Sequence, residues 1–138
     1  MARSDIRIVT IDNTHPDFYR LVGPLLARRD VYKSLGGVPW DDEGKRWTIA
    51  VATGPGSLDR AAGFIGLTTK GALESLWAEP ARRDTLYPRL VAAAVQAADT
   101  GTLHTTVTHN RVPAYEQAGF TTVSTTQNYA KMSWEPSP

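Results

Sequence analysis

The chain has 138 residues and a mass of 15.1 kDa, the size of one domain with a core of its own. Hydrophobic residues make up 41% and charged residues 21%, which is typical of soluble globular proteins and excludes a disordered chain. The net charge of +1 argues against a nucleic-acid scaffold, and the absence of cysteine excludes disulfides, zinc–thiolate sites and a cysteine nucleophile.

The first thirty residues predict a strand followed by a helix. Residues 5–12 alternate in polarity, with isoleucine and valine on successive faces, and predict a strand. Residues 17–29 carry apolar side chains at helical spacing and predict a helix that Gly23-Pro24 interrupts or kinks. Thr14 is the expected cap of this helix. The residues before 5 lead into the alternating stretch and do not form an apolar signal segment, so we expect a cytoplasmic protein.

The middle of the chain reads as an irregular segment followed by three strands. Residues 31–46 are broken by glycine and proline and include an acidic turn, Asp41-Asp42-Glu43. Strands are predicted over residues 47–52, 61–69 and 72–78, with a hairpin loop between the first two. Gly63 and Gly66 suggest a bulge or a close backbone approach in the second of these strands.

The last third predicts two helices and three more strands. A helix over about residues 82–98 precedes a β-branched strand at 103–108, and a short helix at 111–118 ends at Gly119. Two strands at 120–126 and 129–134 close the chain, with residues 134–138 as a loose tail. We therefore expect one domain over residues 1–138, in the α/β (α+β) class. Its mixed central sheet should have about six to seven strands, with helices on both faces.

This element order resembles that of the GNAT N-acetyltransferase superfamily. The C-terminal stretch strengthens the likeness, because Tyr115 stands five residues before the phenylalanine of Gly119-Phe120, as in the family's short helix. Residues 80–90 resemble the family's pyrophosphate loop and the helix that it opens. Here Thr85 and Tyr87 stand where the family has glycine or another small residue, and Pro88 removes an N–H from the helix start.

The resemblance implies an acetyl-CoA-dependent N-acetyltransferase without a metal. The three histidines, His15, His104 and His109, are spaced poorly for metal binding in any case. Acetyl-CoA would lie where two parallel strands splay apart, with an amine of unknown identity as the acceptor. The residues implied for acetyl-CoA binding are Leu76, Trp77, Ala78, Arg82, Arg83, Thr85, Leu86, Tyr87 and Asn110. The arginines bind phosphate well, but they are equally typical of a solvated helix end, and Asp84 reads as a helix cap.

Tyr115 is the candidate general acid and Glu74 the candidate base in this reading. A tyrosine can protonate a departing thiolate, and a carboxylate inside an apolar strand is costly unless it is paired or functional. Each has a structural alternative: Tyr115 as an ordinary core residue of an amphipathic helix, and Glu74 as a residue at a sheet edge or a partner of Lys70 or Arg82. Glu79, beside Pro80 at the strand end, is a weaker alternative for the base. Tyr32, Trp40 and Trp47 are candidates for an aromatic wall of the acceptor site, and Asp41, Asp42 and Glu43 for attraction of a cationic amine.

The altered loop also permits a catalytically degenerate protein of the same fold that binds CoA or another protein. A weaker alternative is a nucleic-acid accessory protein that uses Arg82, Arg83 and Arg89, against which the near-neutral charge argues. We expect no membrane association and either a monomer or a homodimer.

Overall fold

The fold is built on seven strands that form two sheets. The computed structural model describes residues 6–35, 44–53, 59–99 and 101–136. The first sheet is an antiparallel meander, and the second places β7 between β5 and β6. The strands are β1 (Ile6–Asp12), β2 (Arg46–Thr53), β3 (Asp59–Leu67), β4 (Leu73–Ala78), β5 (Leu103–Thr108), β6 (Thr121–Thr125) and β7 (Tyr129–Trp134).

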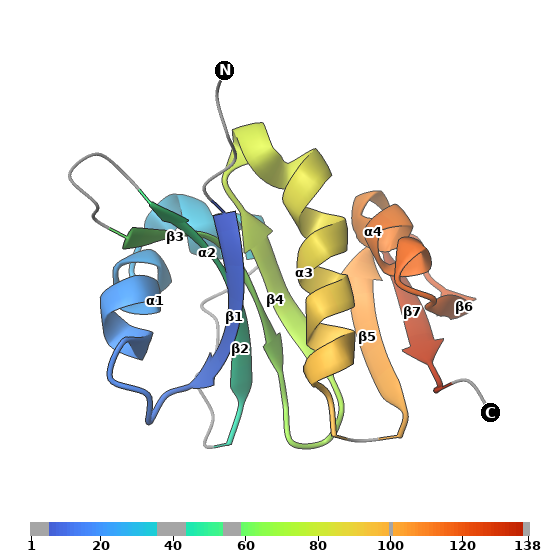
Figure 1. Ribbon diagram of the computed structural model, residues 1–138. Coiled ribbons are helices and arrows are strands. Elements are labelled where there is room, and N and C mark those ends of the chain that lie inside the picture. Colours follow the sequence, from blue (N-terminus) through green and yellow to red (C-terminus); the bar gives the residue numbers. More distant parts are fainter. Residues whose placement is uncertain (1–5, 36–43, 54–58, 100, 137–138) are drawn as a thin grey trace.

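Helices cover the two faces of the first sheet in separate layers. In Figure 1, α1 (Phe18–Leu26) and α2 (Arg29–Leu35) lie to the left of β1, and α3 (Arg83–Ala97) and α4 (Val112–Gln117) lie to its right. The strand pleat supplies each layer with its own core. Ile6 and Ile8 pack against the core under α3, while Val9 and Ile11 pack against the core under α1. The predicted fold class, strand number and helix-covered sheet are confirmed.

Among the described residues, backbone pairing joins the two sheets only where β4 and β5 begin. Ala72 and His104 form an isolated parallel bridge, and the His104 N–H donates to the Gly71 carbonyl at 3.0 Å. One residue further on, the Thr105 hydroxyl donates to the Leu73 carbonyl at 2.7 Å. Beyond this point no ladder joins the described residues of the two strands, so β4 and β5 diverge toward their carboxyl ends.

β4 carries a bulge just after this junction. The β3–β4 register shifts between Phe64 and Gly66, and Ser75 adopts φ 63°, the left-handed region that L-residues rarely occupy. Gly63 permits the close approach that the sequence suggested, because a Cβ there would lie 2.8 Å from the Trp77 carbonyl oxygen. The bulge turns the second half of β4 toward the gap beside β5.

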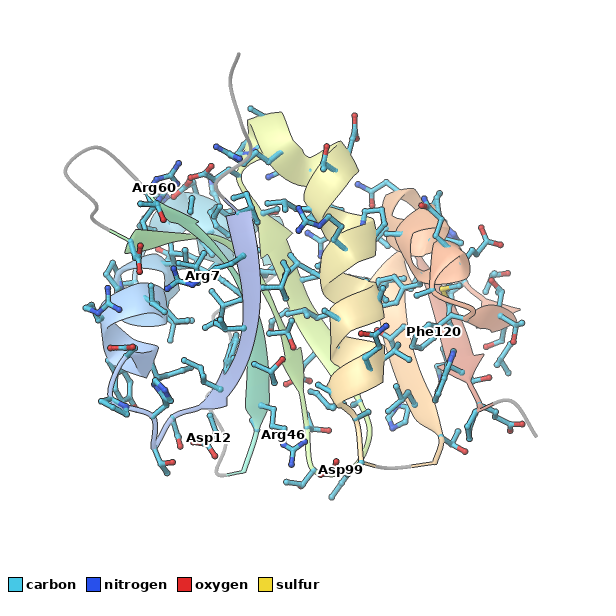
Figure 2. All side chains as sticks on the ribbon, viewed as in Figure 1. Arg7, Asp12, Arg46, Arg60, Asp99 and Phe120 are labelled. Carbon is cyan, nitrogen blue, oxygen red and sulfur yellow. The ribbon has the colours of Figure 1, made fainter. Side chains whose placement is uncertain are left out.

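The carboxyl end of α3 is bonded to the start of β2, at the end of the first sheet away from the carboxyl end of β4. Arg46 of β2 donates to the Ala97 carbonyl at 2.9 Å and pairs with Asp99 at 2.6 Å. Figure 2 places Arg46 and Asp99 together below α3, far from Arg60 at the other end. These bonds satisfy a free carbonyl of the last helical turn and anchor α3 where its core contacts end.

Several sequence expectations about the first helical layer were wrong. Residues 29–35 form α2, although the segment from residue 31 was expected to be irregular. Only Val31 is buried in α2, so the sequence of this helix shows almost no apolar repeat at helical spacing. Thr14 does not cap α1, because its N–H and hydroxyl bind the Asp12 carboxylate. α1 begins at Phe18 and continues through Pro24. Residues 36–43 lie outside the described part of the chain.

No helix in the described ranges is both long enough and apolar enough to span a bilayer.

Candidate active site

The gap between β4 and β5 exposes backbone groups of β4. The Glu79 N–H donates to the Ala62 carbonyl at 2.9 Å, and Trp77 lies opposite Phe64, so both residues point their backbone at β3. Because successive residues alternate, the N–H and carbonyl groups of Leu76 and Ala78 point toward the gap. Of the three residues expected to offer backbone partners, Leu76 and Ala78 therefore face the gap and Trp77 does not.

Tyr115 of α4 lies in the core under α3, near Thr105 at the β4–β5 junction. Its side chain is 0% exposed and packs edge-on against Phe120, with 5.4 Å between the ring centroids (Phe120 is labelled in Figure 2). Among the described residues, no group makes a hydrogen bond with its hydroxyl. Thr105 lies close enough to lower the Tyr115 pKa as a hydrogen-bonding neighbour, but its proton goes to the Leu73 carbonyl and no bond of ordinary geometry joins the two hydroxyls. A buried hydroxyl without a partner is uncommon and calls for an explanation.

Burial raises the pKa of Tyr115 to about 12 because the phenolate would lose its hydration. The neighbouring Thr105 side chain and the positive charge of Arg111 act in the opposite direction but do not offset the burial. The phenol is therefore protonated throughout the neutral range. It is a permanent hydrogen-bond donor near the β4–β5 junction.

A cavity of about 280 Å³ opens between the start of α3 and the start of α4; Ala114 lines it, whereas the buried Tyr115 does not. It brings together three of the residues implied for acetyl-CoA binding, Arg83, Tyr87 and Asn110, which come from two distant segments. Its remaining lining residues are Asp84, Pro88, Pro113, Ala114 and Gln117. The Asn110 side-chain oxygen accepts a bond from the Thr108 hydroxyl, which fixes the side chain at the end of β5.

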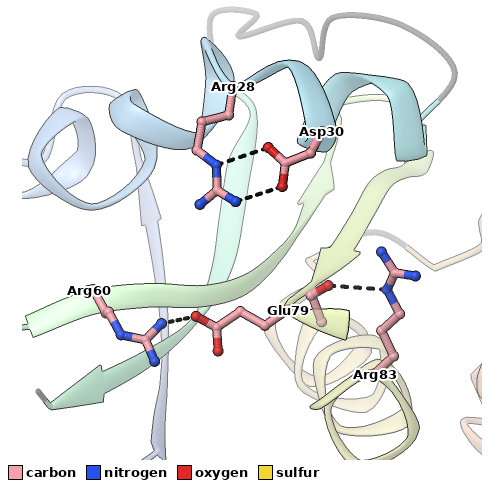
Figure 3. Close-up of polar contacts among 6 residues, drawn as sticks. Arg28, Asp30, Arg60, Glu79 and Arg83 are labelled. Carbon is pink, nitrogen blue, oxygen red and sulfur yellow. Dashed lines mark hydrogen bonds and ion pairs between the residues drawn. The ribbon is translucent and has the colours of Figure 1, made fainter. Parts of the chain in front are cut away.

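The arginines before α3 are held by groups at the end of β4. Arg82, 39% exposed, pairs with Glu79 at 3.2 Å, and Glu79 also pairs with Arg60. The Arg83 Nε donates to the Ala78 carbonyl at 3.3 Å, so it binds one of the groups that face the gap. Figure 3 shows Arg60, Glu79 and Arg83 around the end of β4, with Arg28 and Asp30 on the other side of the strand.

The first turn of α3 contains no proline and follows the 3₁₀ turn Pro80–Arg82 directly. The helix begins at Arg83, so Pro88 is its sixth residue, beyond the turn whose N–H groups lack helical partners. The expectation that Pro88 removes an N–H from that turn was therefore wrong. Asp84 lies inside the turn and does not cap the helix, whose cap position is Arg82. Thr85 is exposed, whereas the Leu86 side chain is buried in the core, so Leu86 offers only its backbone to a ligand.

Glu74 lies on the opposite face of β4 from Leu73 and Leu76, on the side of α1 and α2. Its carboxylate is 40% exposed and pairs with Lys45 at 2.7 Å, not with Lys70 or Arg82. The Lys45 side chain is 0% exposed and lies 4.5 Å from the centre of the Trp47 ring. It fits there because Gly66, between Trp47 and Glu74 in register, has no side chain to occupy the space.

The expected aromatic wall of the acceptor site is only partly supported. Trp47 is fully buried in the core beneath α1, between Phe18 and Phe64, so it cannot line a site. Tyr32 is partly exposed on α2. Trp40 and the acidic turn lie outside the described residues. Within the described ranges, no group of three His, Cys, Asp or Glu side chains is arranged to hold a metal ion.

Several solved structures superpose on nearly the whole of this chain. An acyl-CoA N-acyltransferase from Pseudomonas aeruginosa superposes with a TM-score of 0.69 at 16% identity, over 94% of this chain and 99% of that one. A spermidine N-acetyltransferase from Vibrio cholerae, in complex with CoA and spermine, gives 0.65 at 11% identity, over 95% of each chain. A Campylobacter jejuni N-acetyltransferase in complex with acetyl coenzyme A gives 0.53 at 15% identity, over 96% and 99%.

The chain has the GNAT fold. No protein-family model matches the sequence, and no curated protein matches it. At these identities the likeness establishes the arrangement of the GNAT elements and not the activity. The residues around the gap carry the functional argument.

Four residues at the site were not identified from the sequence. In the sequence, Lys45 and Arg111 look like ordinary surface charges, and Thr105 is one of several threonines in a strand. Ser75 gives no signal for a left-handed backbone, which glycine or asparagine would have given. The left-handed backbone of Ser75 becomes apparent only with the register shift between β3 and β4.

Proposed function

We propose that this protein is an acetyl-CoA-dependent N-acetyltransferase in which Tyr115 is the general acid. The observation that carries the proposal is the Tyr115 hydroxyl, which is fully buried and protonated and makes no hydrogen bond of ordinary geometry with the described residues. It lies near Thr105, at the junction from which β4 and β5 separate. A substrate atom that accepts a hydrogen bond would explain why this donor is kept. The departing sulfur of a thioester is such an atom.

The free backbone groups of β4 support a place for acetyl-CoA in the gap. The N–H and carbonyl groups of Leu76 and Ala78 would bond its amide-containing arm, as an added strand does at a sheet edge. The free N–H groups at the start of α3, with Arg82 and Arg83, would bind its pyrophosphate. Arg83 would leave the Ala78 carbonyl, and Arg82 would add to or exchange its bond with Glu79.

Glu74 and Tyr115 lie on opposite faces of the first sheet, which suits direct transfer. The amine nitrogen would attack the thioester carbon from the face of α1 and α2, and a C–N bond would form. Glu74 would take the proton that the nitrogen loses, directly or through water. The C–S bond would break as Tyr115 donates its proton to the sulfur from the face of α3, giving an amide and the free thiol.

Titration calorimetry with acetyl-CoA, with ADP as the reference ligand, tests donor binding. We expect tighter binding of acetyl-CoA than of ADP. Absence of binding at millimolar acetyl-CoA would overturn the proposal and favour a protein-interaction module with the same fold.

Turnover separates an enzyme from a protein that only binds CoA. A panel of amines is screened with a thiol reagent, which has no protein background because the chain lacks cysteine. Tyr115→Phe should bind acetyl-CoA as the wild type does and lose about 10²-fold or more in kcat. Equal losses in binding and turnover would remove Tyr115 from the acid role.

A further inference from the structure

Arg111 connects the two helical layers across the open end of the gap. It closes the 3₁₀ turn His109–Arg111 that follows β5, and α4 begins at the next residue. Its Nη2 donates to the Ser34 carbonyl at 3.1 Å and lies 3.3 Å from the Ser34 hydroxyl. Ser34 belongs to α2, which lies on the opposite face of the first sheet from α3 and α4 (Figure 1).

The same guanidinium also contacts Tyr87, a residue that lines the cavity. Its central carbon is 5.6 Å from the centre of the Tyr87 ring, within the range of a cation–π contact. Tyr87 lines the cavity together with Asn110, the residue before Arg111. One side chain therefore touches α2 and α3 while it begins α4.

α2 depends on this contact more than a longer helix would. It has seven residues, of which only Val31 is buried, and the Ser34 carbonyl lies in its last turn, where carbonyls lack helical partners. A planar guanidinium can bond that carbonyl and stack on a ring at once, which the point charge of lysine cannot do.

We propose that Arg111 is a positioning residue that couples occupancy of the cavity between α3 and α4 to the placement of α2 on the other face of the sheet. The inference rests on the proposed function, in which the cavity receives the acetyl donor and α2 borders the acceptor. A donor that contacts Tyr87 would fix the guanidinium, and the guanidinium would fix α2. The order of the acceptor face then depends on whether the donor is bound.

Hydrogen exchange with and without saturating acetyl-CoA tests the coupling. In the wild type, acetyl-CoA should slow exchange both around the cavity and in α2. Arg111→Ala should raise the exchange of α2 about tenfold without ligand, as loss of a charged hydrogen bond implies. In that variant acetyl-CoA should still protect the cavity but no longer α2. If Arg111 were purely structural, Arg111→Ala would raise the exchange of α2 without ligand, but acetyl-CoA would protect α2 as it does in the wild type.

Two further variants make the test specific. Arg111→Lys keeps the charge but not the planar fork, and should retain only part of the response. Ser34→Ala removes the hydroxyl but keeps the carbonyl, so its response should match the wild type.

The outcomes separate the two proposals. If acetyl-CoA protects the wild-type cavity while α2 exchanges as before, the coupling is wrong and the proposed function stands. If acetyl-CoA neither binds in the calorimeter nor slows exchange anywhere, the proposed function is wrong and the coupling falls with it.

Discussion

Tyr115→Phe should not destabilise the ligand-free protein at pH 8. The substitution keeps the buried ring and its contact with Phe120, and it removes a hydroxyl that makes no hydrogen bond with the described residues. An unsatisfied buried polar group costs about 1–3 kcal/mol, so its removal should leave the free energy of unfolding unchanged or raise it by about 1 kcal/mol. Ordinary core tyrosines, whose hydroxyls have partners, lose stability on the same change.

The difference between the variant and the wild type should grow at alkaline pH. The Tyr115 pKa is about 12 in the folded protein and 10.0 in the reference state, so the folded state holds its proton in a range where the unfolded chain releases it. The wild type therefore loses stability as the pH rises through this range. With these two values, the loss relative to Tyr115→Phe is about 1 kcal/mol at pH 11 and approaches about 3 kcal/mol above pH 12.

Urea unfolding of both proteins at pH 8, 9.5 and 11 measures this difference. Phe120→Leu is the control for packing, because it alters the same ring contact without touching the hydroxyl and should lower stability equally at every pH. Parallel curves for the wild type and Tyr115→Phe would refute the argument from burial. A loss above about 1 kcal/mol at pH 8 would show that the hydroxyl has a partner after all.

Three other substitutions test separate parts of the site. Arg82→Ala should weaken acetyl-CoA binding in calorimetry while changing the melting temperature little, since exposed ion pairs contribute about 0–1 kcal/mol; unchanged affinity would place the pyrophosphate elsewhere. Gly66→Ala should destabilise the fold by about 3 kcal/mol in urea, because the new methyl overlaps Lys45 and forces it from Glu74; a neutral effect would mean that the lysine has room to move. Thr105→Val should cost about 1–2 kcal/mol by leaving the Leu73 carbonyl unpaired, and an equally stable variant would show that this bond does not hold β4 to β5.

The sequence predicted the elements best where an apolar period was long. The strand at Tyr129–Trp134 was predicted at its observed bounds, and α3 within one residue at each end, because Leu86, Leu90 and Ala94 recur at helical spacing. α2 was missed because its only buried side chain, Val31, cannot establish a period. It is held by packing and by Arg111, a residue 77 positions away from Ser34.

The sequence predicted only those parts of the candidate site that depend on residues close together in the chain. Tyr115 was identified from its spacing to Gly119-Phe120, and its burial follows from the same helix face. The partner of Glu74 was predicted wrongly because it is set by register: Gly66 of β3 lies between Trp47 and Glu74 and leaves the space that Lys45 fills. Two glycines in the strand suggested close approach, but nothing in the sequence identifies the side chain that takes the space.

Three features that lower stability lie near the junction from which β4 and β5 separate. Ser75 holds a left-handed backbone without being glycine, at a cost of about 1 kcal/mol. Tyr115 buries a donor that makes no hydrogen bond of ordinary geometry with the described residues, and Lys45 buries a charge that pairs with Glu74 and lies over the Trp47 ring. Natural folds keep such departures from local preference mainly where function requires them. Their position near the split between β4 and β5 supports the proposed site from this chain's own physics, independently of the structures that it resembles.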